Sequence, residues 1–213
     1  TSGTTSVTVN AIPATPTPGS NSPVCVGAVL SLTSNTISGA TYNWSEPNSF
    51  SSSSQNPSFT PASTASNGTY SVSVTVNGCT GATATISVTV NPIPSAPTAS
   101  SNSPVCAGQD ITLSASSVGG ATYAWTGPNS FSSASQNSTI ASATTAANGT
   151  YSVTATVSGC TSTAGTTSVT VNPIPSAPTA GSIPPLCSGK TITLTASTIT
   201  GATYSWTGPN SFS

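Results

Sequence analysis

The chain has 213 residues and almost no charge, with one Lys, two acidic residues and no His. The charged side chains are Glu46, Asp110 and Lys190. Acid-base catalysis and metal binding both need clusters of titratable side chains or thiolates, and a nucleophilic Ser or Thr needs a neighbouring base. The composition therefore predicts that this chain is not an enzyme and that it binds no metal or cofactor.

The low charge also restricts the partners. A chain with a single Lys cannot neutralise many phosphates, which argues against nucleic acids and against anionic membrane surfaces. The apolar stretches are interrupted well before the length of about 20 residues that a spanning helix needs, so we expect no membrane insertion of this segment. A disordered linker would have a similar composition, and periodicity argues against that alternative.

The sequence repeats with a period of 81, without insertion or deletion. Cysteines and tryptophans recur at this spacing, namely Cys25, Cys106 and Cys187, and Trp44, Trp125 and Trp206. Solenoid repeats are shorter, about 20 to 50 residues, so a period of this length indicates separate domains. In chain order we expect the last strand of a preceding repeat at 1–10, complete repeats at 11–91 and 92–172, and the first half of a further repeat at 173–213.

Within each copy, the pattern predicts short strands. In the second copy, apolar and polar residues alternate over 111–115, 151–157 and 169–171, the period of two of a half-buried strand. Tyr123 and Trp125 share one face of a further strand, and a Gly-Pro-Asn turn follows. No window has helical spacing. The predicted fold class is all-β, a tandem array of two-sheet antiparallel β-sandwiches with the tryptophans in their cores.

Three motifs of the second copy carry a family resemblance. They are Gly-x-x-Ile-Thr-Leu from Gly108, Tyr-x-Trp from Tyr123 and Asn-Gly-Thr-Tyr-x-Val from Asn148. Together they resemble an immunoglobulin-like domain. The resemblance implies that Tyr70 and Tyr151 form its tyrosine corner and that Ala115 and Val153 replace its usual inter-sheet cysteines.

A narrower resemblance follows from Val105-Cys106-Ala107-Gly108, from the segment Trp-Thr-Gly-Pro-Asn-Ser-Phe at 125–131, and from Ser158-Gly159-Cys160. These segments are similar to the immunoglobulin-like or PKD-like repeats of large Bacteroidota surface proteins. Such proteins are often exported by the type 9 pathway and include gliding-motility adhesins. The resemblance implies an extracellular or cell-surface location and a role as spacer or adhesive stalk.

Each complete copy carries two cysteines, Cys25 with Cys79 in the first and Cys106 with Cys160 in the second. Paired cysteines without His or a CxxC motif favour disulfides in an oxidising compartment over a zinc site. Cys187, in the third copy, has no partner in its own copy.

Three pairings remain open. In the immunoglobulin-like topology, Cys106 precedes strand B and Cys160 follows strand F, which places them on the order of 25 Å apart, whereas a disulfide needs Cα atoms within about 7 Å. The preferred pair is therefore Cys25 with Cys160, across the junction between copies. Bonds within each copy are the alternative if the segment before strand B folds back, and bonds between chains are the third.

The junctions and the loops lead to two functional hypotheses. Each junction repeats the sequence Asn-Pro-Ile-Pro-Ser-Ala-Pro, at 91–97 and 172–178, and predicts a semi-rigid extended spacer. The first hypothesis is a structural filament or stalk whose chains bundle with other copies of the same chain. The second is an adhesin that binds surface glycans through loop aromatics. Phe50, Phe131 and Phe212 are the candidate contact points, although the favoured interpretation is that each caps the core, because singly placed aromatics usually pack.

Overall fold

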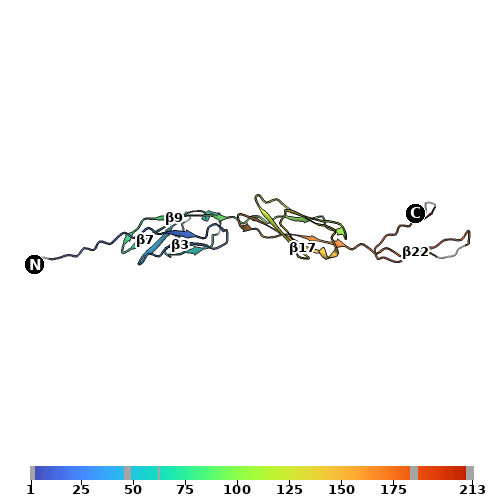
Figure 1. Ribbon diagram of the computed structural model, residues 1–213, viewed down its shortest axis with the longest axis horizontal. Coiled ribbons are helices and arrows are strands. Elements are labelled where there is room, and N and C mark those ends of the chain that lie inside the picture. Colours follow the sequence, from blue (N-terminus) through green and yellow to red (C-terminus); the bar gives the residue numbers. More distant parts are fainter. Residues whose placement is uncertain (1–2, 46–48, 62, 183–186, 210–213) are drawn as a thin grey trace.

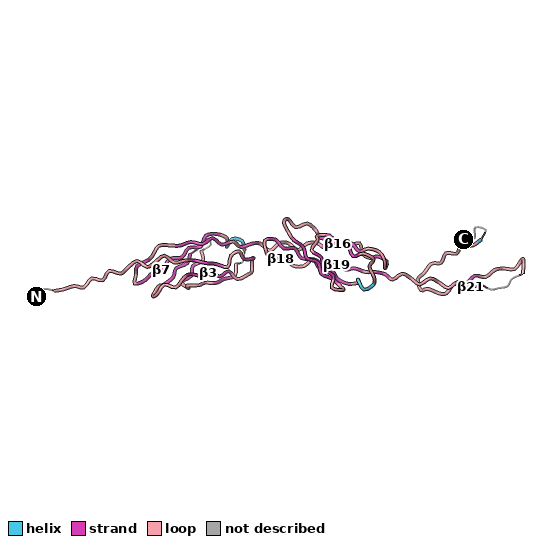
Figure 2. Tube along the Cα trace, in the orientation of Figure 1, coloured by secondary structure: helices cyan, strands magenta, loops and turns pink. Residues whose placement is uncertain are grey.

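The computed structural model describes residues 3–45, 49–61, 63–182 and 187–209. The described chain is an elongated rod in which an extended N-terminal segment, two β-sandwiches and a third, partial unit follow one another along one axis (Figure 1). Strands and loops make up nearly all of it, and the helical residues are confined to short 3-10 turns (Figure 2).

The first sandwich consists of two antiparallel sheets. One has the strand order β1-β3-β6 and the other the order β5-β4-β7-β8, with β9 also pairing with β7. The bounds are β1 (Pro18–Ser20), β3 (Leu30–Ser34), β4 (Thr41–Ser45), β5 (Ser51–Ser52), β6 (Ser58–Phe59), β7 (Gly68–Val76), β8 (Cys79–Thr80) and β9 (Ala84–Val88). This is the immunoglobulin-like arrangement, in which β3, β4 and β7 take the places of strands B, C and F.

A short parallel pair forms a further, two-stranded sheet in this sandwich. After β1 the chain leaves the first sheet, and β2 (Val24–Cys25) pairs in parallel with β10 (Val90–Asn91), with Cys25 opposite Asn91. The last strand of the copy therefore ends beside the cysteine that precedes strand B.

The second sandwich repeats this topology one period later. Its sheets have the orders β11-β13-β16 and β15-β14-β17-β18, β19 pairs with β17, and β12 pairs in parallel with β20. The bounds are β11 (Ala99–Ser101), β12 (Val105–Cys106), β13 (Ile111–Ala115), β14 (Thr122–Gly127), β15 (Phe131–Ser133), β16 (Asn137–Ile140), β17 (Gly149–Val157), β18 (Cys160–Thr161), β19 (Gly165–Val169) and β20 (Val171–Asn172).

Each sandwich has a core of its own, which the alternating strand residues form. In β13 and β17 every second side chain is buried, so the period of two in the sequence faces the space between the sheets. Trp44 and Trp125 are at most 1% exposed, and each donates from Nε1 to a backbone oxygen, of Gln55 and of Gln136 respectively. Burying the ring while its N–H keeps a partner avoids the cost of an unpaired donor.

The tyrosine corners are present in both sandwiches. Tyr70 donates its hydroxyl to the carbonyl oxygen of Ser66 at 3.0 Å, and Tyr151 donates to that of Ala147 at 3.0 Å. The acceptors belong to the 3-10 turns η1 (Thr64–Ser66) and η2 (Thr145–Ala147), which lead into strand F. Ala115 and Val153 are also buried, so apolar packing occupies the inter-sheet positions.

The third copy is less complete in the described residues. Strands β21 (Ala180–Ser182) and β22 (Leu194–Ala196) pair in antiparallel fashion, as do β1 and β3 in the first copy. Trp206 is only half-buried, since the described part of this copy has no second sheet to cover the ring. The buried tryptophan that the sequence predicts here therefore belongs only to the two complete copies.

Candidate functional site: a covalent joint between two sandwiches

A tight hairpin turn forms one half of the joint. Val157 and Cys160 face each other across β17 and β18, and the two residues between them, Ser158 and Gly159, have φ of 50° and 80°. Two consecutive positive φ values are typical of a type I′ turn, whose twist matches that of a β-hairpin. The turn presents Cys160 at the end of the second sandwich that faces the first.

The opposite half of the joint comes from the first sandwich. Cys25 lies in β2 beside Asn91, the last residue of β10, and the next amide, of Val26, donates to the Asn91 carbonyl oxygen at 2.9 Å. The parallel pairing therefore holds Cys25 at the point where the chain leaves this sandwich for the linker.

Cys25 and Cys160 form a disulfide bond, with Cα atoms 5.7 Å apart and a sequence separation of 135. Of the three pairings that the sequence left open, the structure contains the cross-junction one. Cys79, Cys106 and Cys187 are free thiols.

A bond within the first copy is prevented by the sheet register. Gly68, at the start of β7, pairs with Val88, whereas Cys79 follows the far end of that nine-residue strand. Cys25 lies at the Val88 end, next to Asn91. At about 3.3 Å per residue the two cysteines are separated by roughly the length of β7, on the order of 25 Å.

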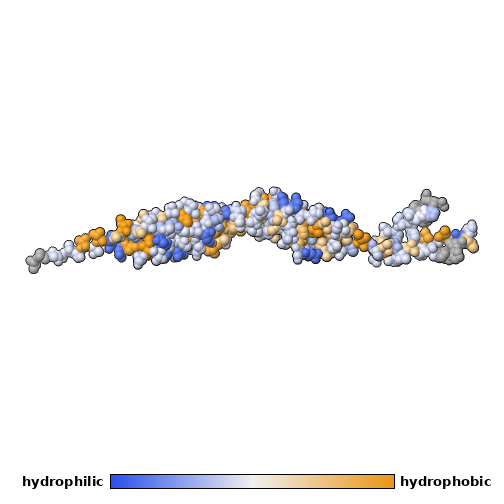
Figure 3. Space-filling view, viewed as in Figure 1, coloured by the Kyte–Doolittle hydropathy of each residue, from blue (hydrophilic) through white to orange (hydrophobic). Residues whose placement is uncertain are grey.

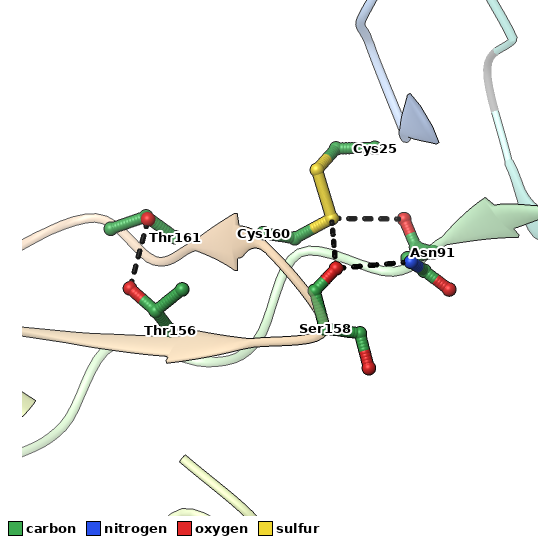
Figure 4. Close-up of a disulfide and its surroundings, with 6 residues drawn as sticks. All are labelled: Cys25, Asn91, Thr156, Ser158, Cys160 and Thr161. Atoms are coloured by element: carbon green, nitrogen blue, oxygen red, sulfur yellow. Dashed lines mark hydrogen bonds between the residues drawn. A yellow bond between two sulfur atoms is a disulfide. The ribbon is translucent and has the colours of Figure 1, made fainter. Parts of the chain in front are cut away.

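Asn91 connects both halves of the joint (Figure 4). Its side chain donates from Nδ2 to the carbonyl oxygen of Ser158 at 3.1 Å, in the hairpin turn of the next sandwich. Its own carbonyl oxygen lies 3.9 Å from the sulfur of Cys160. The sequence places Asn91 only at the start of the linker motif, and its recurrence as Asn172, directly before the first proline of the next linker, is the signal for a joint residue.

The linker itself is attached to the second sandwich. Pro97 is buried, and a Cβ added to Gly165 of β19 would overlap the Pro97 carbonyl oxygen. The chain from 91 to 97 is thus held at both ends, by Asn91 at the hairpin turn and by Pro97 against β19.

The candidate contact phenylalanines face inward. Phe50 lies with its ring centroid 4.6 Å from that of Phe59 and 6.4 Å from that of Tyr70, and Phe131 lies 5.4 Å from Tyr151. Both are partly buried against the cores of their sandwiches. They therefore cap the core, as the favoured interpretation held, because a ring packed beside the tyrosine corner has less apolar surface in contact with water than a ring exposed in a loop. Phe212 lies outside the described residues.

A shallow hollow in the third copy is lined by Leu194, Ala196, Tyr204 and Trp206, among others. These residues are the counterparts, one or two periods later, of side chains that form the closed cores of the complete copies. The hollow is thus the uncovered counterpart of the core that each complete copy encloses. Other exposed large apolar residues are Val7, Val9 and Ile12 in the N-terminal segment, Val29 just before β3, Ile93 and Ile174 in the linkers, and Ile192 in the third copy. The apolar surface of the N-terminal segment is visible in Figure 3.

In the part of the chain that the structure describes, no three His, Cys, Asp or Glu residues are close enough together to hold a metal ion. Nor do these residues include a helix that is long and apolar enough to cross a membrane. Asp110 has a structural role, since its Oδ1 accepts a hydrogen bond from the amide of Ser142 at 2.9 Å.

Comparison with solved structures gives immunoglobulin-like proteins at low identity. One chain of the crystal structure of the mouse coronavirus receptor-binding domain complexed with its murine receptor matches at 15% identity and a TM-score of 0.48, over 75% of this chain and 100% of that one. Domains A168–A170 of titin match at 12% and 0.44, over 70% and 61%. No curated protein matches.

The family model described as Ig-like domain, CHU_C associated, matches residues 13–92 and 94–173. The two matched segments cover most of the chain and coincide with the two sandwiches described above. The chain therefore belongs to the CHU_C-associated Ig-like domain family and contains two consecutive copies of that domain.

Proposed function

We propose that this chain is a structural repeat segment of an extracellular filament or cell-surface stalk, in which disulfides lock successive Ig-like domains at their joints. The observation that carries this proposal is the Cys25–Cys160 bond, which joins two domains and does not cross-link either domain to itself. A domain that only needed stability would gain it from a bond within its own core. A bond across a joint fixes instead the position of one domain relative to the next.

The chemistry of the bond supports an extracellular location. Disulfides persist in oxidising compartments and are rare in the cytosol. Together with the resemblance to repeats of large Bacteroidota surface proteins, this supports export to the cell surface or medium, with the type 9 pathway as the proposed route.

The near absence of charge suits lateral packing with other copies of the same chain. Between chains that carry so few charges there is little electrostatic repulsion, so association should respond weakly to salt. Glycan binding through loop aromatics has less support, since Phe50 and Phe131 pack on the cores of their own domains.

Single-molecule stretching between the two ends of the chain tests the mechanical role. Under oxidising conditions the bond carries the load from Cys25 directly to Cys160, so the segment between them cannot be extended. After reduction the same chain should lengthen by up to about 490 Å more, at about 3.6 Å per residue. A Cys160→Ser variant should behave like the reduced chain, and Cys187→Ser should behave like the wild type.

The mechanical proposal fails if the oxidised wild-type chain releases the same length as Cys160→Ser. Equal extensions would mean that the bond does not protect the two domains from load.

A further inference from the structure

Cys79 and Cys106 occupy the same two positions as the bonded cysteines, one period away from each. Cys79 is the counterpart of Cys160 in the preceding copy, and Cys106 is the counterpart of Cys25 in the following copy. Both are free thiols, and Cys106 is exposed, whereas Cys160 is buried beneath its partner domain. The structure around each can therefore be compared with a joint that is already bonded.

The surroundings of Cys79 already match those of Cys160. Asn10 donates from Nδ2 to the carbonyl oxygen of Asn77 at 3.0 Å, as Asn91 does to Ser158 at 3.1 Å. The sulfur of Cys79 lies 3.7 Å from the carbonyl oxygen of Asn10, compared with 3.9 Å in the bonded joint. The hairpin turn also has the same form, because Asn77 and Gly78 have φ of 49° and 78°.

The surroundings of Cys106 match those of Cys25. Cys106 lies opposite Asn172 in the parallel pair of β12 and β20, just as Cys25 lies opposite Asn91. The next amide, of Ala107, donates to the Asn172 carbonyl oxygen at 2.8 Å, compared with 2.9 Å for Val26 and Asn91. Each free thiol is thus held in the geometry of a half-joint.

We propose that Cys79 and Cys106 each form one half of an inter-domain disulfide of the same kind as Cys25–Cys160. The other cysteine of each bond belongs to a further repeat of this family in the same array. Cys79 pairs with the cysteine before strand B of the repeat that precedes it. Cys106 pairs with the cysteine after strand F of the repeat that follows 92–172. This inference rests on the proposed structural role and extends it from one joint to every joint.

The chemistry is thiol-disulfide exchange with a disulfide oxidant. One cysteine thiolate attacks the oxidant and releases one of its sulfurs as a thiol, and the second cysteine then displaces the other. Two protein thiols become one disulfide, and the oxidant is reduced to two thiols. Held at a Cα separation like that of the bonded joint, the second thiol is close enough to complete the exchange.

Bonds at every joint would turn the array into a covalent ladder with two rails. Each rail would be a continuous path in which chain segments and disulfides alternate. One such segment runs from Cys79 to Cys106 and contains one linker. The segments from Cys25 to Cys79 and from Cys106 to Cys160, which contain strands B to F, become rungs. At about 3.6 Å per residue, the maximum length of a fully extended rail is roughly 100 Å for every two repeats. The maximum length of the chain without disulfides is roughly 580 Å for the same two repeats.

The test is to insert a second copy of residues 92–172 after Asn172 in the full chain and to count disulfides by intact mass and thiol labelling under a glutathione redox buffer. The five cysteines of the present chain, with one bond and three free thiols, provide the baseline. The lengthened chain has seven cysteines. We expect two bonds and three free thiols.

Two other results would overturn the inference. Five free thiols would mean that Cys106 finds no partner in the added repeat. Three bonds with one free thiol would mean that the cysteines pair within each copy.

Matched single substitutions in the lengthened chain identify the thiol that is used. Cys106→Ser should leave one bond and four free thiols, whereas Cys79→Ser should leave two bonds and two free thiols. Retention of two bonds in Cys106→Ser would also overturn the proposal. The thiol count does not depend on mechanical behaviour, so it separates failure of the half-sites from failure of the load-bearing role, which stretching measures.

Discussion

Asn91 donates a hydrogen bond from its side chain to the carbonyl oxygen of Ser158. This bond links the last strand of the first sandwich to the hairpin turn between β17 and β18 of the second. The same residue lies opposite Cys25 in the sheet. A single side chain therefore orients the hairpin turn that presents Cys160 to Cys25. The disulfide and this hydrogen bond lie next to each other at the same joint, and both are in contact with Asn91 (Figure 4).

Asn91→Ala should make the Cys25–Cys160 bond easier to reduce. A hydrogen bond contributes about 1 kcal/mol net, which corresponds to a roughly fivefold shift in the thiol-disulfide equilibrium. Titration with dithiothreitol, followed by thiol labelling, measures the shift. Asn172→Ala is the matched control, because Asn172 ends the equivalent strand of the second sandwich and lies opposite Cys106, which is a free thiol. An equal shift in both variants would contradict the role of Asn91.

Ser34→Ala should stabilise the first sandwich by about 1 kcal/mol. The Ser34 side chain is buried, and its Oγ has no hydrogen-bond partner among the described residues, so it bears a desolvation cost that Ala does not. The second sandwich has Ala115 at this position. Ala115→Ser is the converse experiment and should destabilise its domain by a similar amount, as measured by urea denaturation of the oxidised protein.

Gly127→Ala should destabilise the second sandwich by about 1 to 3 kcal/mol, because a Cβ at this position would overlap the ring of Tyr151. The ring is held by its hydrogen bond to Ala147 and cannot move aside. Gly119→Ala serves as the control, since nothing lies within 4 Å of its added Cβ. Hydrogen exchange of the β14 and β17 amides reports on this domain alone, and similar exchange in both variants would contradict the prediction.

Reduction of the disulfide should loosen the joint and leave both sandwiches folded. Each domain has its own closed core around Trp44 or Trp125, and neither core includes Cys25. We expect unchanged tryptophan fluorescence after reduction, together with a broader distribution of end-to-end distances in small-angle scattering. Loss of the buried tryptophan signal on reduction would show instead that the bond holds the domains themselves together.

Stability should fall at alkaline pH through Tyr151. Burial raises the pKa of this hydroxyl above its usual value of 10.0, so the folded state holds the proton more tightly than the unfolded state does. The resulting contribution to stability is complete below pH 10 and is lost as the pH rises from 10 towards the folded pKa. Urea denaturation at pH 8 and above 10 measures the loss, and a Tyr151→Phe variant should lose less stability over the same interval.

Several features were accessible from the sequence because they depend on local pattern. Alternation of apolar and polar residues predicted β13 and β17, and the tyrosine corners followed from the family motif. The Cys25–Cys160 pairing could be preferred but not decided, because the family topology gives the directions of strands B and F, and the reach of a disulfide disfavours a bond within one copy. The orientation of Phe50 and Phe131 could not be decided, since a ring after a turn can face inward or outward with the same sequence pattern.

The sequence by itself determined the repeat period, the all-β class and the scarcity of charge, because each of these can be read from residue types and spacing along one chain. Only the tertiary structure decided how the joint is made. The parallel pairing of β2 with β10 brings Cys25 to the end of its domain, and the bond from Asn91 to Ser158 positions the next hairpin against it. Both contacts join segments that lie far apart in the chain, so they depend on strand register and domain orientation that no local pattern records.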